Sequence, residues 1–93
     1  MTHSIELIRK ITDRTATISV IGLGYVGLPT AVFFAEEGFR VIGADLDETK
    51  VESINSGRSP LHELQVDTQL ADAVQRGRLS ATTDVKEAVR RSD

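Results

Sequence analysis

Apolar residues along the chain alternate between short runs and longer segments in which they recur every three or four positions. Short runs bounded by turn residues predict buried strands, whereas the longer spacing predicts helices with one apolar face. The predicted strands cover residues 17–21, 39–44 and 79–82. The predicted helices of this region cover residues 25–37, 47–56, 64–76 and 84–91. Strands and helices therefore alternate along most of the chain.

The first fifteen residues form a separate predicted helix. Ser4 can cap it, and the apolar residues at positions 7, 8 and 11 lie on one stripe of its surface. We therefore divide the chain into an N-terminal helix, residues 1–15, and a domain that covers residues 16–93.

Two of the later helices begin with aspartate. Asp47 is a predicted N-cap, because a short carboxylate can accept hydrogen bonds from the free N–H groups of a first turn. Asp84 and Glu87 have the spacing of a capping box, in which each side chain accepts from the backbone N–H of the other residue.

The order of the elements indicates an α/β fold. Strands that alternate with helices form a parallel sheet with right-handed crossovers. We expect a Rossmann-type sheet with flanking helices, three strands in the order 3-2-1, and an extra N-terminal helix. The sequence reaches Asp93 after a helix, where the next crossover would deliver a fourth strand. The domain is therefore expected to be truncated, with its first strand as an open edge.

The segment 22–27 carries the motif with the clearest chemistry. It reads Gly-Leu-Gly-Tyr-Val-Gly, a G-x-G-x-x-G fingerprint directly after a predicted strand and before a predicted helix. Gly22 permits the tight turn, Gly24 lets a pyrophosphate approach the backbone, and Gly27 lets the helix pack closely on the strand. Tyr25 and Val26 are expected to contribute backbone amides to phosphates at the helix N-terminus. The motif predicts a dinucleotide-phosphate site.

An acidic residue completes this constellation. Asp45 lies 18 residues after Gly27, at the end of the second predicted strand, where a carboxylate can accept both ribose hydroxyls of a dinucleotide. The same charge repels a 2′-phosphate, and no arginine follows directly, so the sequence favours NAD over NADP. Lys50 either reaches the adenosine ribose or a phosphate, or is simply solvated. Asp45 could also serve only as a helix N-cap.

Composition excludes several other functions. The 93 residues are 40% apolar and 27% charged, with a formal net charge of -3. No apolar run reaches the roughly 18 residues of a membrane span, and no basic stripe marks a nucleic-acid surface. Cysteine is absent, which removes disulfides, zinc thiolates and cysteine nucleophiles. The N-terminus lacks the apolar core of a secretory signal, so we expect a cytoplasmic protein.

The remaining candidate side chains are interpreted as surface or core residues. His3 lies in the N-terminal helix, where an exposed histidine is expected to be inert. Three candidates share the loop after residue 57 and are interpreted as surface residues rather than ligand contacts: Arg58, His62 and Glu63. The aromatic residues are expected in the core or against the sheet: Phe33, Phe34 and Phe39. No histidine and carboxylate converge as an acid–base pair for hydride transfer, so the chain is not expected to catalyse a reaction alone.

Residues 20–30, Val-Ile-Gly-Leu-Gly-Tyr-Val-Gly-Leu-Pro-Thr, are more specific than the fingerprint itself. They resemble the opening of the UDP-glucose/GDP-mannose dehydrogenase family, the nucleotide-sugar 6-dehydrogenases. The resemblance continues through residues 38–43, 45–50, 54–60 and 77–84. The N-terminal helix is similar to that of the UDP-N-acetylmannosamine and UDP-N-acetylglucosamine dehydrogenase branch. One departure follows Glu63: this residue matches the family's Glu-Pro-Gly-Leu segment, but the Pro-Gly pair after it is replaced by Leu-Gln.

The resemblance implies the NAD-binding segment of an enzyme that oxidises the C6 alcohol of a UDP-sugar twice, with two NAD, to a uronic acid. It implies that Gly22, Gly24 and Gly27, with Tyr25 and Val26, hold the pyrophosphate, and that Asp45 binds the adenosine ribose. Lys50 corresponds to the basic residue that the family has five positions later. The catalytic cysteine of the family and the domains that hold the UDP-sugar would lie outside these residues.

Two other hypotheses remain open from the sequence. A small Rossmann unit could sense a nucleotide without chemistry, as a regulatory module. Alternatively, the open first strand could pair with a second copy of the chain and produce a homo-oligomer.

Overall fold

Three parallel strands form the centre of the structure. The computed structural model describes residues 16–60 and 67–92. Its strands are β1 (Thr17–Ile21), β2 (Arg40–Ala44) and β3 (Leu79–Thr82), and their order in the sheet is β1-β2-β3. The Rossmann-type parallel sheet with the order 3-2-1 is therefore confirmed. The predicted helix 1–15 and the start of the predicted helix 64–76 lie outside the described residues.

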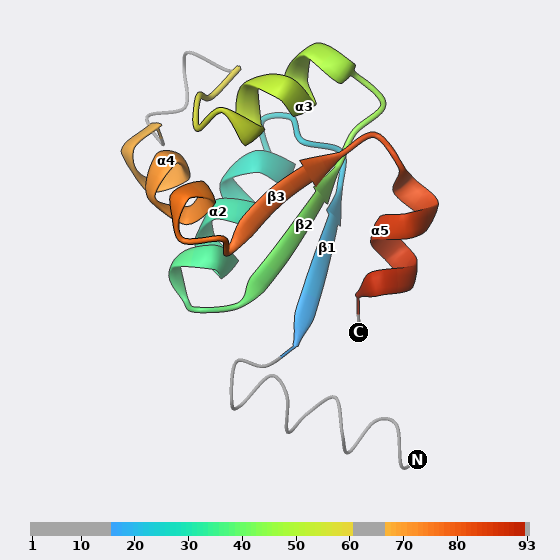
Figure 1. Ribbon diagram of the computed structural model, residues 1–93, viewed down its shortest axis with the longest axis horizontal. Helices are drawn as coiled ribbons and strands as arrows, with labels where there is room; N and C mark the ends of the chain where they lie inside the picture. The colour runs from blue at the N-terminus through green and yellow to red at the C-terminus, as the bar shows by residue number, and fades with distance from the viewer. Residues whose placement is uncertain (1–15, 61–66, 93) are drawn as a thin grey trace.

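Helices cover both faces of this sheet (Figure 1). They are α2 (Gly27–Glu36), α3 (Glu48–Asn55), α4 (Asp67–Gln75) and α5 (Val85–Arg91). Helices α2 and α4 pack on one face, α5 packs against β1 and β2 on the other, and α3 lies beyond the carboxyl ends of the strands (Figure 1). The described residues thus form a helix–sheet–helix sandwich whose loops meet at the carboxyl edge of the sheet.

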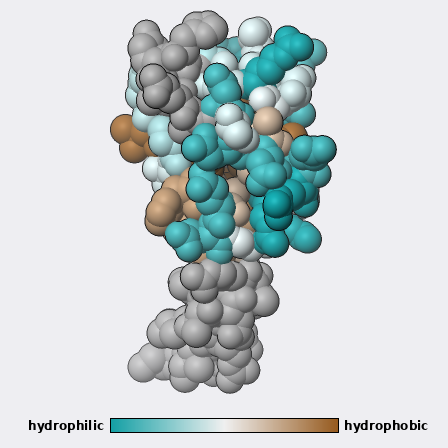
Figure 2. All heavy atoms as spheres, turned by 90° about the vertical axis from the view of Figure 1, so that its left-hand side faces the viewer, coloured by the Kyte–Doolittle hydropathy of each residue, from teal (hydrophilic) through white to brown (hydrophobic). Residues whose placement is uncertain are grey.

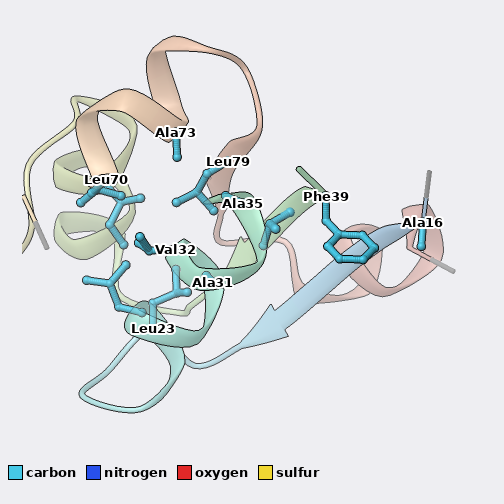
Figure 3. Packing of buried hydrophobic residues seen from close by; sticks show 12 residues of the cluster. Ala16, Leu23, Ala31, Val32, Ala35, Phe39, Leu70, Ala73 and Leu79 are labelled. Carbon is cyan, nitrogen blue, oxygen red and sulfur yellow. The ribbon is translucent and has the colours of Figure 1, made fainter. Parts of the chain in front are cut away.

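The main core lies between the sheet and the α2–α4 layer. Residues of β2 alternate between faces, so that Val41 joins this core and Ile42 joins a smaller cluster under α5. Figure 3 shows the larger cluster, in which small alanines of α2 let the helix lie close to the strands. The outer surface of the same layer is mostly polar, as the predominance of teal over brown in Figure 2 shows.

Most predicted boundaries agree with the structure, and the differences have local causes. The second strand begins at Arg40 rather than Phe39, because the Phe39 N–H donates to the Phe34 carbonyl (3.1 Å) and closes the turn that follows α2. Helix α2 begins at Gly27 instead of Tyr25, since the preceding residues form the turn itself. Phe39 is buried as expected, but Phe33 is 58% exposed, so its predicted place in the core is wrong.

The two predicted aspartate caps form, one of them in a different way. The Asp47 carboxylate accepts from the N–H groups of Thr49 and Lys50, and so caps α3. The Asp84 carboxylate accepts from the Glu87 N–H at 3.0 Å, but the reciprocal half of the capping box is absent in this part of the structure. The Asp84 N–H donates instead to the Thr82 hydroxyl (3.0 Å), and the Glu87 carboxylate pairs with Arg90.

The outer edge of β3 is closed by a side chain. The Asn55 amide donates to the carbonyl of Ala81 (2.9 Å) and accepts from its N–H (2.8 Å), as the peptide of a neighbouring strand would. This pairing satisfies the edge and blocks further strand addition at that point. On the other side of the sheet, β1 pairs with β2 alone among the described strands.

Candidate functional site

The glycine-rich turn, residues 22–27, connects β1 to α2 at the carboxyl edge of the sheet. Gly22 has a φ of 86°, a left-handed conformation that other residues rarely adopt. Its N–H donates to the Ala44 carbonyl of the neighbouring strand at 2.8 Å. The turn therefore starts from a point fixed by β2, directly beside the end of that strand.

The two other glycines of the turn meet different surroundings. A Cβ on Gly27 would overlap the carbonyl oxygen of Gly22 and lie 2.9 Å from its carbonyl carbon. Helix α2 thus packs against the turn at a distance that only glycine permits. A Cβ on Gly24 would meet no described atom within 4 Å. The protein itself does not require glycine there, and the open space suits a group that approaches the backbone from outside.

The N-terminus of α2 faces this open space. The i→i−4 hydrogen bonds of this region begin with the Leu28 N–H, which donates to the Gly24 carbonyl. The N–H groups of Val26 and Gly27 precede that bond and have no acceptor inside the helix. Together with the helix dipole they favour an anion, and no acidic side chain lies in the first turn to compete with one.

Asp45 joins the glycine-rich turn to the loop after β2. Its carboxylate accepts from the Leu23 N–H and from the Asp47 N–H, each at 2.9 Å. The Lys50 ammonium lies 3.6 Å from the same carboxylate. Asp45 is therefore not the N-cap of α3, a role that Asp47 fills, and the structure brings Asp45, Lys50 and the turn together.

These contacts act on the charge of Asp45. The Asp47 N–H, the Leu23 N–H and, more weakly, the Lys50 ammonium lower the pKa of the Asp45 carboxyl below the ordinary value of 3.8, against an opposing effect of burial. The side chain is consequently an anion at neutral pH. It presents a fixed carboxylate beside the glycine-rich turn.

The lowered pKa of Asp45 makes part of the stability dependent on pH. A carboxyl whose pKa is lower in the folded state stabilises the fold above its unfolded pKa and loses that contribution as the pH falls through the folded pKa. The stability difference between the wild-type chain and Asp45→Asn should therefore be constant above about pH 6 and shrink below about pH 4. Urea denaturation at a series of pH values measures it. A difference that persists or grows at low pH would contradict these contacts.

An apolar cleft adjoins Asp45 on the α5 side of the turn. It has a volume of about 450 Å³, and its lining residues come from the ends of β1 and β2 and the start of α5: Ile21, Gly22, Ala44, Asp45, Leu46 and Val85. Leu46 is 82% exposed and lines the same cleft as Asp45. Such a cleft suits a flat apolar ring attached to a polar group. Sequence reasoning missed Leu46 and Val85, because neither belongs to a spaced motif.

A second cleft of about 440 Å³ lies between α3 and the end of β3. Its lining includes two carboxylates, Glu48 and Glu52, beside Asn55. Two acids disfavour a phosphate, so this cleft is the weaker candidate for a nucleotide.

The other sequence candidates lie outside this constellation. The side chains of Tyr25 and Val26 are largely exposed, which is consistent with a contribution from backbone groups. Arg58 follows α3, where its carbonyl accepts from the Ser53 hydroxyl. His3, His62 and Glu63 lie outside the described residues.

Two other kinds of site, a metal centre and a membrane span, were sought in the described part of the chain. Among residues 16–60 and 67–92, no group of three or more histidine, aspartate or glutamate side chains could hold a metal ion. The helices of these two segments are too short or too polar to cross a bilayer. The described residues thus combine backbone N–H groups that suit an anion with a fixed carboxylate and an adjoining apolar cleft.

Comparison with known proteins identifies the family. The sequence profile of the UDP-glucose/GDP-mannose dehydrogenase family, NAD binding domain, matches residues 16–93. The chain belongs to this family. The resemblance noted in residues 20–30 is thereby confirmed, and NAD is the cofactor by which the family's domain is defined.

Characterised members of the family are similar over most of the chain. GDP-mannose 6-dehydrogenase of Pseudomonas aeruginosa is 47% identical over 76 residues, which are 82% of this chain and 17% of that enzyme. UDP-N-acetyl-D-mannosamine dehydrogenase of Methanococcus aeolicus is 44% identical over 71 residues, 76% of this chain and 16% of that protein. The chain thus spans less than a fifth of the length of these dehydrogenases.

Solved structures of the family share the fold. A UDP-glucose dehydrogenase from the hyperthermophilic archaeon Pyrobaculum islandicum superposes with a TM-score of 0.79 at 42% identity, over 84% of this chain and 18% of that one. The residues described here also fit the cofactor of the nucleotide-sugar dehydrogenase family. Gly24 leaves room that a Cβ would fill, and the adjoining helix N-terminus suits phosphates.

Proposed function

We propose that this chain binds NAD at the carboxyl edge of its sheet. The pyrophosphate lies on the glycine-rich turn, against the backbone at Gly24 and the N–H groups of Val26 and Gly27. The ribose hydroxyls of the adenosine bind Asp45, with Lys50 beside them. The observation that carries the proposal is the hydrogen bond of 2.9 Å between the Leu23 N–H and the Asp45 carboxylate, because it joins the two halves of the site.

The adenine ring has a place in the same arrangement. The apolar cleft beside Asp45, bordered by Leu46 and Val85, receives a flat ring attached to the ribose. The glycine-rich turn holds the phosphates on one side of the carboxylate, and the cleft holds the base on the other. This order matches the order of groups in an adenosine diphosphate.

Asp45 also selects NAD over NADP in this proposal. Its carboxylate is anionic at neutral pH and repels a 2′-phosphate on the ribose that it binds. Lys50 lies 3.6 Å from the same carboxylate, so the nearest cation is paired with Asp45 and offers a phosphate little additional charge.

Replacing Asp45 tests this assignment. Asp45→Asn keeps the size of the side chain and removes its charge, and we expect NAD to bind about tenfold to a hundredfold more weakly, since charge-assisted hydrogen bonds to the ribose are lost. The preference for NAD over NADP should shrink in parallel. Isothermal titration of the chain with both dinucleotides measures each effect.

Asp47→Asn is the matched control, because it removes the same charge two residues away and asparagine still caps a helix. It should bind NAD as the wild-type chain does. Equal NAD affinity in the wild-type chain and Asp45→Asn would rule out the proposed role of Asp45.

The proposal extends to the whole protein of which this chain is the NAD-binding part. That protein is an NAD-dependent 6-dehydrogenase that acts on a nucleoside diphosphate sugar. This substrate class includes the UDP-hexoses and the UDP-N-acetylhexosamines. Oxidation of a C6 alcohol to a uronic acid removes four electrons, which two NAD accept as two hydrides, and water supplies the second oxygen of the carboxyl group. NAD supplies the hydride acceptor when bound, whereas the residues of this chain bind and orient it. A cytoplasmic location and a role in polysaccharide biosynthesis belong to the same proposal.

The 93 residues contain no cysteine, the residue that the family resemblance implies for catalysis. The chain by itself is therefore expected to bind NAD without reducing it. The sugar would be held by residues outside this sequence, as the small share of each relative that it spans suggests.

A further inference from the structure

A buried glycine near the carboxyl end of β2 lies beneath the glycine-rich turn. Gly43 pairs with Val20 of β1 and Ala81 of β3, so it lies in the interior of the sheet. Glycine weakens a strand interior and often marks a place where another group approaches closely. Here the approaching group is a side chain. A Cβ on Gly43 would lie 2.8 and 2.9 Å from the two δ-methyl carbons of Leu23, and 3.4 Å from its Cγ.

Leu23 is the second residue of the glycine-rich turn, and it is anchored at two points. Its side chain is 1% exposed and belongs to the core cluster that Figure 3 shows, together with Ala31 and Val32 of α2. Its backbone N–H donates to the Asp45 carboxylate. The height of the turn above the sheet therefore depends on how deeply the Leu23 side chain enters the space over Gly43.

We propose that Gly43 is a positioning residue for NAD: it leaves the space in which Leu23 sits, and thereby holds the glycine-rich turn at the level of Asp45. This inference rests on the proposed function, since it assigns the cause of the geometry that binds NAD. The three atoms nearest to a Cβ at position 43 all belong to Leu23, so Gly43 acts on the turn through Leu23.

A side chain at position 43 has a definite consequence. Both δ-methyl groups of Leu23 would lie less than 3.0 Å from the new Cβ, so the Leu23 side chain, which is 1% exposed, has to shift within a close-packed core. We expect Leu23 to shift toward the surface as a whole, so that its backbone N–H moves away from the Asp45 carboxylate. The glycine-rich turn and the Asp45 carboxylate then leave the relative positions that their hydrogen bond fixes, although neither Leu23 nor Asp45 has been replaced.

The experiment uses Gly43→Ala, alone and combined with Leu23→Val. Valine has no δ carbons, so the double variant restores the space that the alanine fills. NAD should bind Gly43→Ala about tenfold more weakly, and the double variant should return to within about threefold of the wild-type affinity. Ile54→Val is the matched control, because it loosens the same core from α3 without adding an atom beside Leu23. It should leave NAD binding unchanged at a comparable loss of stability.

A second measurement does not depend on NAD. NMR titration of the Asp45 carboxyl carbon reports its hydrogen bond to Leu23 in the free protein. The pKa of Asp45 should rise toward the ordinary value in Gly43→Ala, fall again in the double variant, and stay unchanged in Ile54→Val. A wild-type chain that binds no NAD would contradict the proposed function, and this titration would still test the role of Gly43.

Two outcomes would overturn the inference. One is an unchanged Asp45 titration in Gly43→Ala, which would mean that Leu23 finds another rotamer while the turn stays in place. The other is a loss of NAD binding in Gly43→Ala that Leu23→Val does not restore, which would make the effect one of general destabilisation.

Discussion

Gly27→Ala should destabilise the domain more than any other single methyl group added to the glycine-rich turn. The new Cβ would overlap the carbonyl oxygen of Gly22 and lie 2.9 Å from its carbonyl carbon. Both atoms belong to the backbone, so no side-chain rotation relieves the clash, and helix α2 must move away from β1. We expect a loss of at least about 3 kcal/mol, against the roughly 5–10 kcal/mol that stabilise a domain of this size.

Urea denaturation followed by circular dichroism measures this loss as a lower midpoint. Gly24→Ala is the matched control, because it adds the same methyl group three residues earlier in open space. An unchanged midpoint for Gly27→Ala would contradict the close packing of α2 on the turn.

The second large effect is on binding and comes from that same control variant. Gly24 does not have a positive φ, and its added Cβ meets no described atom, so Gly24→Ala should keep or slightly raise the stability, by up to about 1 kcal/mol. The methyl group nevertheless occupies the space proposed for the pyrophosphate. NAD should therefore bind at least about tenfold more weakly, a cost of about 1.4 kcal/mol or more.

Isothermal titration with NAD and with adenosine separates the causes of such a loss. Adenosine has no phosphate and should bind more weakly than NAD. Its affinity should be the same for the wild-type chain and for Gly24→Ala. A Gly24→Ala variant that binds NAD like the wild-type chain would show that the pyrophosphate lies elsewhere.

The strands, the order of the sheet and the positions of the turn and Asp45 were predictable from the sequence. Strands and helices alternate regularly, and the spacing of apolar residues that distinguishes them can be read from a single sequence. The spacing between Gly27 and Asp45 also follows from topology, since a helix and a strand of ordinary length must fit between them. Parallel strands bring their carboxyl ends together, which places both features at one edge.

Other parts of the site depend on tertiary contacts that no local pattern encodes. Leu23 is one of the variable positions of the fingerprint, and only the packing over Gly43 shows that it anchors the turn. Two features of the sequence could have indicated this packing: an apolar residue at position 23 of the turn, and a glycine at position 43 of the strand that follows. Leu46 and Val85 border the cleft because the loop after β2 and the start of α5 converge there. Phe33 looked apolar enough for the core, yet its place on α2 leaves it exposed.

The structure also explains why one carboxylate serves two purposes. Asp45 holds the glycine-rich turn and the loop after β2 together through two backbone N–H groups, and the same hydrogen bonds keep it anionic. The free chain therefore already has the geometry that the proposed ligand requires. Little reorganisation is expected when NAD binds.

The most direct test of NAD binding at this edge is a titration of the ¹⁵N-labelled chain with NAD, followed by its backbone amide signals. The largest shifts should occur at residues 22–27 and at Asp45 and Leu46, with little change in α4. Shifts centred on the second cleft, around Glu52 and Asn55, or no shifts at saturating NAD, would contradict the assignment of the glycine-rich turn as the cofactor site.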